Sequence, residues 1–149
     1  MLKIVDSELL DYIEDDPVRR HIPKNFRVTD NRTTFALCYG KNKEVDAMIC
    51  CSFCEDVPQE ENELAKSGNI AVFYTVWSYT RGAGTDIIFE TVKWIQKNKP
   101  EVDRFVTLSP LTEMARKFHL RNGAIEYRMN KTSVNFEYII EGKNARTLD

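Results

Sequence analysis

The hydrophobic residues of this chain follow two periods, one typical of strands and one typical of helices. Residues 70–77 are almost all β-branched, aromatic or apolar, which favours a strand covered on both faces near the middle of a sheet. After Arg81-Gly82-Ala83-Gly84 the apolar residues recur at helical spacing, so we expect a helix from about Thr85 to about Lys99. The two glycines therefore lie between a strand and the start of a helix.

The remaining apolar runs predict further strands and helices. The strands are expected at 33–39, 45–54, 104–109, 124–129 and 133–140. Short polar turns join the first two and the last two of these strands, which predicts two antiparallel hairpins. One helix is expected over 6–13, where Asp6 is a suitable cap and Pro17 sets a limit. Another is expected over 112–122, because Gly123 is a common helix stop.

Length and composition favour a single domain. The chain has 149 residues, of which 42% are hydrophobic and 30% are charged, and this predicts one globular domain over 1–149 with its own core. Residues 141–149 are polar and are expected to fray. We expect a monomer or a homodimer.

Charge and hydropathy argue against several classes of partner. A net charge of −2 and the lack of a Lys/Arg-rich run leave no basic footprint for nucleic acid. The first six residues are interrupted by charge too soon for a signal peptide, and no apolar stretch approaches the length that spans a membrane. We therefore predict a cytoplasmic protein with no nucleic-acid or membrane partner.

The cysteines are interpreted as structural. They are Cys38, Cys50, Cys51 and Cys54, and most of them lie in an apolar run with the pattern of a strand. Cys51 and Cys54 have C-x-x-C spacing, but no second pair of ligands accompanies them. Reduced, buried thiols are therefore favoured over a metal site, and no metal and no disulfide framework are predicted.

Two charged segments keep more than one interpretation. Residues 17–23 carry Arg19, Arg20 and His21; the two arginines either cover surface or line a substrate entrance, and His21 is interpreted as structural. Residues 54–68 are rich in acids and form either a solvated loop or a lip that would favour an amine-bearing substrate.

The glycine turn is a candidate anion site. The first N–H groups of a helix lack internal partners and the helix dipole is positive there, so an anion is stabilised. Gly82 and Gly84 lack the Cβ atoms that would keep a phosphate away from the backbone. The alternative is a plain strand-to-helix turn, because short glycine motifs also occur by chance.

The order of elements, together with two motifs, resembles the GNAT superfamily of acyl-CoA-dependent N-acyltransferases. The acyl-CoA motif of that family, R/Q-x-x-G-x-G/A, is matched at its first four positions by residues 81–86, and residues 76–80 fit its usual preamble. The later family signature has an Ala, an apolar-Tyr pair and a Gly-Phe turn. Here Ala115, Phe118-His119 and Gly123-Ala124 take those places.

The resemblance covers roughly 33–138 and implies a fold and a reaction. The implied fold is α+β, with a mixed, mostly antiparallel twisted sheet that is flanked by helices and has a splayed central strand pair. The implied activity is transfer of an acyl group, typically acetyl from acetyl-CoA, to a primary amine of a small molecule or protein by direct attack. The implied CoA-binding residues are Val76, Trp77, Arg81, Gly82, Ala83, Gly84 and Thr85.

Three residues stand out against the family pattern. Asp86 occupies a position where the family has Gly or Ala, and a carboxylate there either points away from the pyrophosphate or repels it. His119 takes the place of the usual Tyr general acid and is either that acid or a core histidine. Tyr74 is a further candidate catalytic residue. The alternative implied by these departures is a degenerate family member that binds or regulates without catalysis; stand-alone chains of this kind occur in bacteria and their phages.

Overall fold

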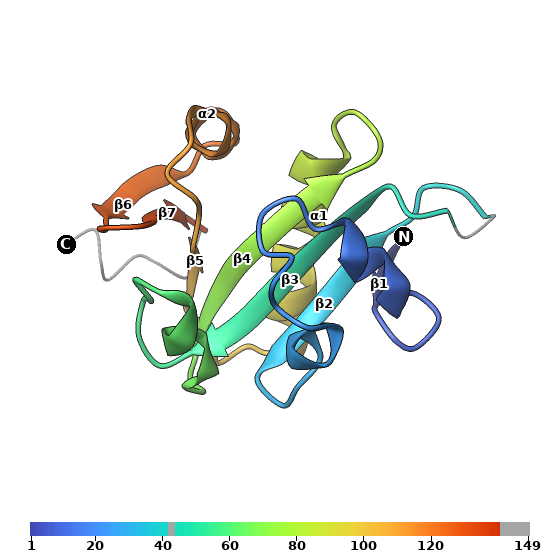
Figure 1. Ribbon diagram of the computed structural model, residues 1–149, viewed down its shortest axis with the longest axis horizontal. Coiled ribbons are helices and arrows are strands. Elements are labelled where there is room, and N and C mark those ends of the chain that lie inside the picture. The colour runs from blue at the N-terminus through green and yellow to red at the C-terminus, as the bar shows by residue number, and fades with distance from the viewer. Residues whose placement is uncertain (42–43, 141–149) are drawn as a thin grey trace.

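One open sheet forms the centre of the molecule (Figure 1). The computed structural model describes residues 1–41 and 44–140, and within them seven strands are ordered β1-β2-β3-β4-β5-β7-β6. The strands are β1 (Leu2–Ile4), β2 (Arg32–Leu37), β3 (Ala47–Cys54), β4 (Ile70–Ser78), β5 (Arg104–Thr107), β6 (Ile125–Met129) and β7 (Val134–Tyr138). Neighbouring strands are antiparallel except β4 and β5, which run parallel.

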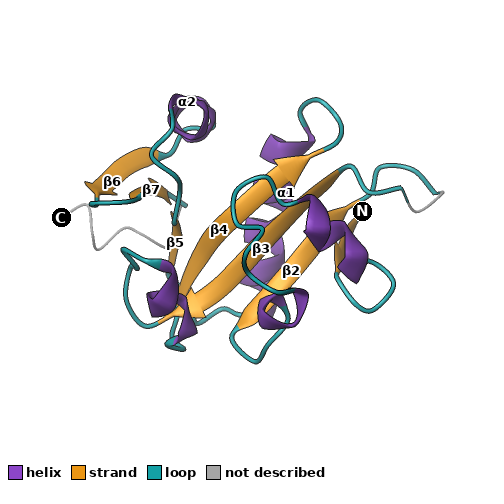
Figure 2. Cartoon of the chain, viewed as in Figure 1, coloured by secondary structure: helices purple, strands orange, loops and turns teal. Residues whose placement is uncertain are grey.

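Helices cover the two faces of the sheet in different ways (Figure 2). The α-helices α1 (Ala83–Asn98) and α2 (Glu113–Arg121) pack on one face, and Figure 1 shows α1 behind β2, β3 and β4. The opposite face is covered by the N-terminal segments and by short 3-10 helices. These are η1 (Leu10–Asp15), η2 (Lys24–Arg27) and η3 (Glu61–Ala65).

The two α-helices form where the sequence pattern places them. In α1 the buried residues include Ile87, Ile88, Val92 and Ile95, which lie on one stripe at helical spacing. In α2 the side chain of Thr112 accepts a hydrogen bond from the amide of Ala115, which is the usual N-cap arrangement.

The sheet separates two hydrophobic clusters, and β4 contributes to both. Ala71 and Phe73 pack in the cluster under α1, whereas Val72, Tyr74 and Trp77 pack under the N-terminal segments. Burial on both faces explains why residues 70–77 are apolar almost without interruption. The four cysteines are free and buried, as expected, and burial raises the pKa of the thiols of Cys50, Cys51 and Cys54.

Most sequence expectations are confirmed. The α+β class, the mostly antiparallel mixed sheet, both hairpins and the helices near 85–99 and 112–122 are present. Residues 42–43 of the first expected turn, and the tail 141–149, lie outside the described part of the chain. Within that part, no helix has both the length and the apolar composition needed to cross a bilayer.

The expected amphipathic helix over 6–13 is wrong. Residues 7–9 form turns, and the following helix is the 3-10 helix η1. Its N–H groups bond three residues back, as in the contact of the Tyr12 amide with the Leu9 carbonyl (3.1 Å). Glu14 and Asp15 end η1 and Asp16 comes directly after it. Acidic residues at this end are disfavoured by the negative end of a helix dipole, so they do not support a longer helix. The short strand β1 was not expected either, because its pattern is too brief to be distinguished.

Candidate active site

The parallel pair β4 and β5 separates partway along its length. Register runs from Ile70 opposite Arg104 to Phe73 opposite Thr107, and the amide of Leu108 makes one further bond to the Phe73 carbonyl (3.0 Å). Beyond this point β4 continues to Ser78 while β5 has ended. The edge of β4 that faced β5 therefore has no strand partner from residue 74 onward, and the expected splayed central pair is confirmed. We call this place the β4–β5 split.

A β-bulge lies at the split. In the pairing of β3 with β4, Cys51 lies opposite Phe73 and Cys50 opposite Thr75, so Tyr74 is the extra residue. A bulge bends its strand and increases the local twist, which turns the last part of β4 away from β5. The register of the sheet thus produces the split.

The glycine turn follows directly after β4. Gly82 has a φ of 84° in the left-handed region, where a side chain would be strained, and no atom lies within 4 Å of where its Cβ would be. The amide of Ala83 bonds to the Thr80 carbonyl (3.1 Å), and the amide of Asp86 bonds to the Gly82 carbonyl (3.2 Å). Within the described residues no acceptor bonds the amides of Gly84 and Thr85, as expected for the first turn of a helix.

Asp46 holds the chain that leads into this turn. Its carboxylate accepts hydrogen bonds from the Thr80 hydroxyl (2.6 Å) and the Tyr39 amide (2.7 Å), and its carbonyl accepts the amides of Tyr79 and Thr80. The hydrogen bond from Thr80 is the main reason that the pKa of Asp46 is lowered. The start of α1 is thereby tied to the loop between β2 and β3.

Helix α2 packs against the other side of the turn. A Cβ atom on Gly84 would lie 3.4 Å from the Phe118 ring and 3.8 Å from the Ser78 hydroxyl. The Thr85 hydroxyl donates to the side-chain oxygen of Asn122 (2.8 Å) at the end of α2. The start of α1, the end of β4 and helix α2 therefore meet at Gly84.

His119 belongs to a buried network beside this meeting point. Its Nδ1 lies 2.7 Å from the Tyr138 hydroxyl, which also accepts a hydrogen bond from Asn122 (3.3 Å), and its ring stacks on Phe136. Burial lowers the pKa of His119 to about 4, so the imidazole is neutral at pH 7. An imidazolium acid at this position is therefore disfavoured near neutral pH.

The burial of His119 should make the stability of the fold depend on pH. The folded pKa of about 4 lies below the ordinary value of 6.5, so the unfolded state binds more protons between these values. The free energy of unfolding should fall by about 3 kcal/mol as the pH drops from about 6.5 to about 4. We expect His119→Phe to remove this part of the fall, as measured by urea unfolding at pH 7 and pH 4.5. An equal fall in both proteins would contradict the assignment.

Tyr74, the other expected catalytic residue, is not brought near His119. Its side chain packs in the cluster under the N-terminal segments, on the face of the sheet opposite α1. Burial raises its pKa far above the ordinary value. Trp77 is buried on the same face as Tyr74, whereas Val76 is half-buried against the α1 cluster. Val76 and Trp77 thus border the unpaired part of β4 from opposite faces.

Asp86 faces away from the split. Its carboxylate accepts a hydrogen bond from the hydroxyl of Tyr39, which follows β2, and this bond raises the pKa of Tyr39 to about 12. Asp86 also lines a hollow of about 340 Å³ beside β1 and β2, together with Phe89 and Lys93. Its carboxylate is held on the side of α1 that faces these strands.

Several residues around the site were not identified from the sequence. Asp46 and Asn122 support the glycine turn through contacts with residues 34 and 37 positions away, so no local pattern marks them. The sequence does not decide whether Arg19 covers surface or lines a substrate entrance. The structure places its guanidinium at the β4–β5 split. Its Nε donates to the Tyr74 carbonyl (2.8 Å) and its Nη2 to the Leu108 carbonyl (2.7 Å).

Several solved structures are similar to this chain over most of its length. Arabidopsis thaliana NAA60 in complex with acetyl-CoA matches with a TM-score of 0.67 at 15% identity, over 95% of this chain and 99% of that chain. The ribosomal-protein-S18-alanine N-acetyltransferase from Escherichia coli matches with a TM-score of 0.64 at 12% identity, over 97% of each chain. Malonyl-CoA decarboxylase from Cupriavidus metallidurans matches with a TM-score of 0.70 at 14% identity. In that case 93% of this chain corresponds to only 60% of the decarboxylase chain.

No family model matches the sequence, and no curated protein matches it. At the identities given above, the structural likeness establishes the fold. Together with the split β4–β5 pair and the glycine turn, it shows that the chain has the fold of the GNAT superfamily of N-acyltransferases.

Proposed function

We propose that this protein is an acyl-CoA-dependent N-acyltransferase that transfers an acetyl group from acetyl-CoA to a primary amine of a small molecule or a protein. The observation that carries the proposal is the β4–β5 split directly beside the N-terminus of α1. The edge of β4 from Val76 to Ser78 has no strand partner on this side, and the amides of Gly84 and Thr85 have no acceptor among the described residues. Such groups require hydrogen-bonding partners, and an extended ligand that ends in phosphates supplies both kinds.

The glycine turn is the proposed pyrophosphate site. The amides of Gly84 and Thr85 lack acceptors, and the open space beside Gly82 lets an anion approach the backbone. Arg81 is exposed and adds positive charge at this end of the helix. Asp86, the one carboxylate in the first turn, is engaged by Tyr39 and lies on another side of α1. The residues present therefore fit a bound CoA.

The unpaired part of β4 is the proposed site of the pantetheine arm and the thioester. From Val76 to Ser78 its edge is available for main-chain hydrogen bonds with the amides of the arm. Bound acetyl-CoA would supply an activated acyl group as a thioester. The chain's own residues orient that group and bring the amine to it, which is where most of the acceleration of a two-substrate reaction arises.

The known structures support this assignment. The NAA60 structures contain acetyl-CoA in one case and a bisubstrate analogue in the other. The chain covers nearly the whole of NAA60 and of the Escherichia coli enzyme, whereas the decarboxylases are much longer. Transfer to an amine is therefore favoured over decarboxylation.

An acetyl-transfer assay tests the proposal. The protein is incubated with acetyl-CoA and single amines, including n-butylamine, hydroxylamine and a peptide with a free N-terminus. Thiol release and mass spectrometry of the acceptor are then recorded. We expect acetylated product that depends on the protein. Arg81→Gln should raise the KM for acetyl-CoA about tenfold, the effect of about one charge-assisted hydrogen bond. Lys97→Gln, at the far end of α1, is the control and should leave KM unchanged. Failure to acetylate any amine would remove the catalytic assignment.

The second candidate is a binding module that holds acyl-CoA without transferring the acyl group. The observation in its favour is that His119, at the position of the usual acid, is buried and neutral at pH 7. Saturable acetyl-CoA binding without product from any amine would favour this candidate. Binding accompanied by product would exclude it.

A further inference from the structure

The side chains of Arg19, Glu61 and His21 form a cluster on the face of the sheet opposite α1. Arg19 joins the carbonyls of Tyr74 and Leu108, so one guanidinium spans β4 and the end of β5 where they separate. Its remaining nitrogen, Nη1, donates to Glu61 Oε1 (2.5 Å). The carboxylate of Glu61 is thus fixed one side chain away from the β4–β5 split.

His21 is held by the other oxygen of the same carboxylate. Its Nε2 lies 2.6 Å from Glu61 Oε2, although the two residues are 40 positions apart in the chain. Burial raises the pKa of Glu61, but hydrogen bonds from His21 and Arg19 outweigh burial and hold the pKa below its usual value. A carboxylate only accepts hydrogen bonds, so Nε2 carries a hydrogen, and in the neutral form of the ring the lone pair is on Nδ1. The His21 side chain is 63% exposed, so solvent and a substrate can reach the ring.

We propose that His21 is the base that deprotonates the acceptor amine, and that Glu61 and Arg19 are positioning residues that orient it at the acceptor side of the β4–β5 split. The proposal rests on the transferase function proposed above and extends it to the second substrate. A base oriented by a carboxylate, which is itself fixed by a third group, is a recurring way of activating a nucleophile.

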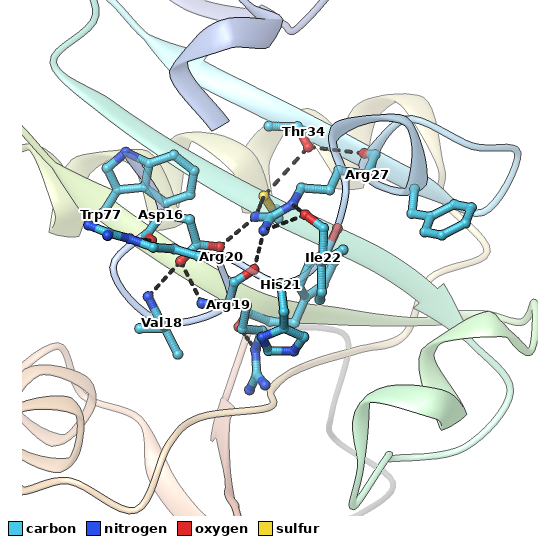
Figure 3. Close-up of polar contacts among 12 residues, drawn as sticks. Asp16, Val18, Arg19, Arg20, His21, Ile22, Arg27, Thr34 and Trp77 are labelled. Carbon is cyan, nitrogen blue, oxygen red and sulfur yellow. Dashed lines mark hydrogen bonds and ion pairs between the residues drawn. The ribbon is translucent and has the colours of Figure 1, made fainter. Parts of the chain in front are cut away.

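The need for a base follows from the chemistry of the acceptor. An alkylamine is an ammonium ion at pH 7, because its pKa is about 10, and it has no lone pair with which to attack a thioester. The charged groups that the described residues place around His21 are Glu61 from η3, which it contacts directly, and Arg19, which binds the same carboxylate; Arg20 instead donates to the Asp16 carbonyl. The buried Asp16–Arg27 pair is joined to the same segment, because Arg27 also donates to the Arg19 carbonyl (Figure 3). Asp16 already accepts from Arg27 and from two amides, which leaves His21 as the group suited to take a proton.

The proposed step is balanced. One proton moves from the ammonium to Nδ1 of His21, and the freed lone pair attacks the thioester carbonyl carbon. The N–C bond forms and the C–S bond breaks, so the electron pair leaves on the thiolate. The thiolate takes the second proton released by the amine nitrogen, and the imidazolium returns its proton to water. Glu61 stabilises the imidazolium while it exists.

Paired acceptors test the role of His21. n-Butylamine is charged at pH 7, whereas hydroxylamine is largely neutral and needs no base. We expect His21→Gln to lower kcat/KM for n-butylamine about 100-fold and to change it less than about twofold for hydroxylamine. In this variant only the free amine should react, so kcat/KM for n-butylamine should rise about tenfold per pH unit up to about pH 10. Lys24→Gln, an exposed residue of the same N-terminal region, is the control and should match the wild type.

A spectroscopic measurement distinguishes a positioning role of Glu61, which orients the His21 ring, from a purely structural role. The chain has two histidines, so ¹⁵N NMR of the imidazoles identifies each one. We expect His21 to carry its hydrogen on Nε2 in the wild type and to lose that preference in Glu61→Gln. Equal losses of kcat/KM for both amines, or a hydrogen on Nδ1 in the wild type, would overturn the role of His21. Acetyl-CoA binding without n-butylamine acetylation would also overturn it, whereas a lack of acetyl-CoA binding would overturn the proposed function itself.

Discussion

Arg27→Met is expected to lower the free energy of unfolding by about 3–5 kcal/mol, the range seen when one partner of a buried ion pair is removed. Both side chains of the Arg27–Asp16 pair are fully buried, and Arg27 Nη1 lies 2.5 Å from Asp16 Oδ2 (Figure 3). Methionine fills similar space but leaves the carboxylate charged in a nonpolar region. The uncompensated charge is the main cost.

Arg27 also binds the segment that carries the proposed acceptor site. Its guanidinium donates to the carbonyls of Arg19 (2.5 Å) and Ile22 (3.1 Å), and its own carbonyl accepts from the Thr34 hydroxyl on β2 (3.0 Å). Arg27 thereby links residues 19–22 to strand β2 of the sheet. Arg27→Met should loosen this segment as well as destabilise the fold.

Urea unfolding of three variants separates these contributions. Arg116→Met, on the exposed surface of α2, is the control and should stay within about 0.5 kcal/mol of the wild type. Adding Asp16→Asn to Arg27→Met should recover part of the loss, because Asn keeps an acceptor for the amides of Val18 and Arg19 but carries no charge. A loss below about 1 kcal/mol in Arg27→Met would show that the pair is not closed as described.

Gly84→Asp is expected to raise the Kd for acetyl-CoA at least about 100-fold, which corresponds to about 2.7 kcal/mol. The new carboxylate would lie in the first turn of α1, where the pyrophosphate is proposed to bind. It would take up part of that site, and its negative charge would repel the pyrophosphate. An acidic residue in the first turn is compatible with the helix dipole, but the Cβ atom of residue 84 would face the Phe118 ring at 3.4 Å, so urea unfolding must first show that the variant is folded.

Gly84→Ala is the matched control. Its methyl group would lie 3.4 Å from the Phe118 ring and 3.8 Å from Ser78, which is ordinary contact and close to the limit of tight packing. We expect the Kd to change only a few-fold. A large loss in Gly84→Ala would mean that the ligand requires the backbone of Gly84 itself.

The elements that the sequence predicts best are those whose apolar period is long and consistent. Residues 70–77 and the helix after Gly84 are examples, because both faces of β4 and one stripe of α1 are buried. The glycine turn was located for the same reason, since it lies between two clear patterns. Thr112 as an N-cap and Gly123 after α2 were readable from local chemistry, and Gly123 has the positive φ that favours glycine.

Contacts between segments that are distant in the chain could not be predicted from the pattern of the sequence. The contact between His21 and Glu61 joins the segment before η2 to η3, and the sequence favours a structural His21 because no acid lies near it along the chain. The bulge at Tyr74 depends on the register between β3 and β4, which periodicity does not specify to one residue. The direction in which a side chain points is equally hard to predict from the sequence. The hydrogen bond from the Tyr39 hydroxyl is what shows that the Asp86 carboxylate points away from the β4–β5 split.

The central claim is that the start of α1 and the unpaired end of β4 bind acyl-CoA, and amide NMR during an acetyl-CoA titration tests it most directly. We predict saturable shifts that are largest at the amides of residues 82–85 and 76–78, and we predict that Gly84→Asp abolishes them. Absence of saturable shifts in the wild type, or shifts confined to the N-terminal segments, would contradict the claim.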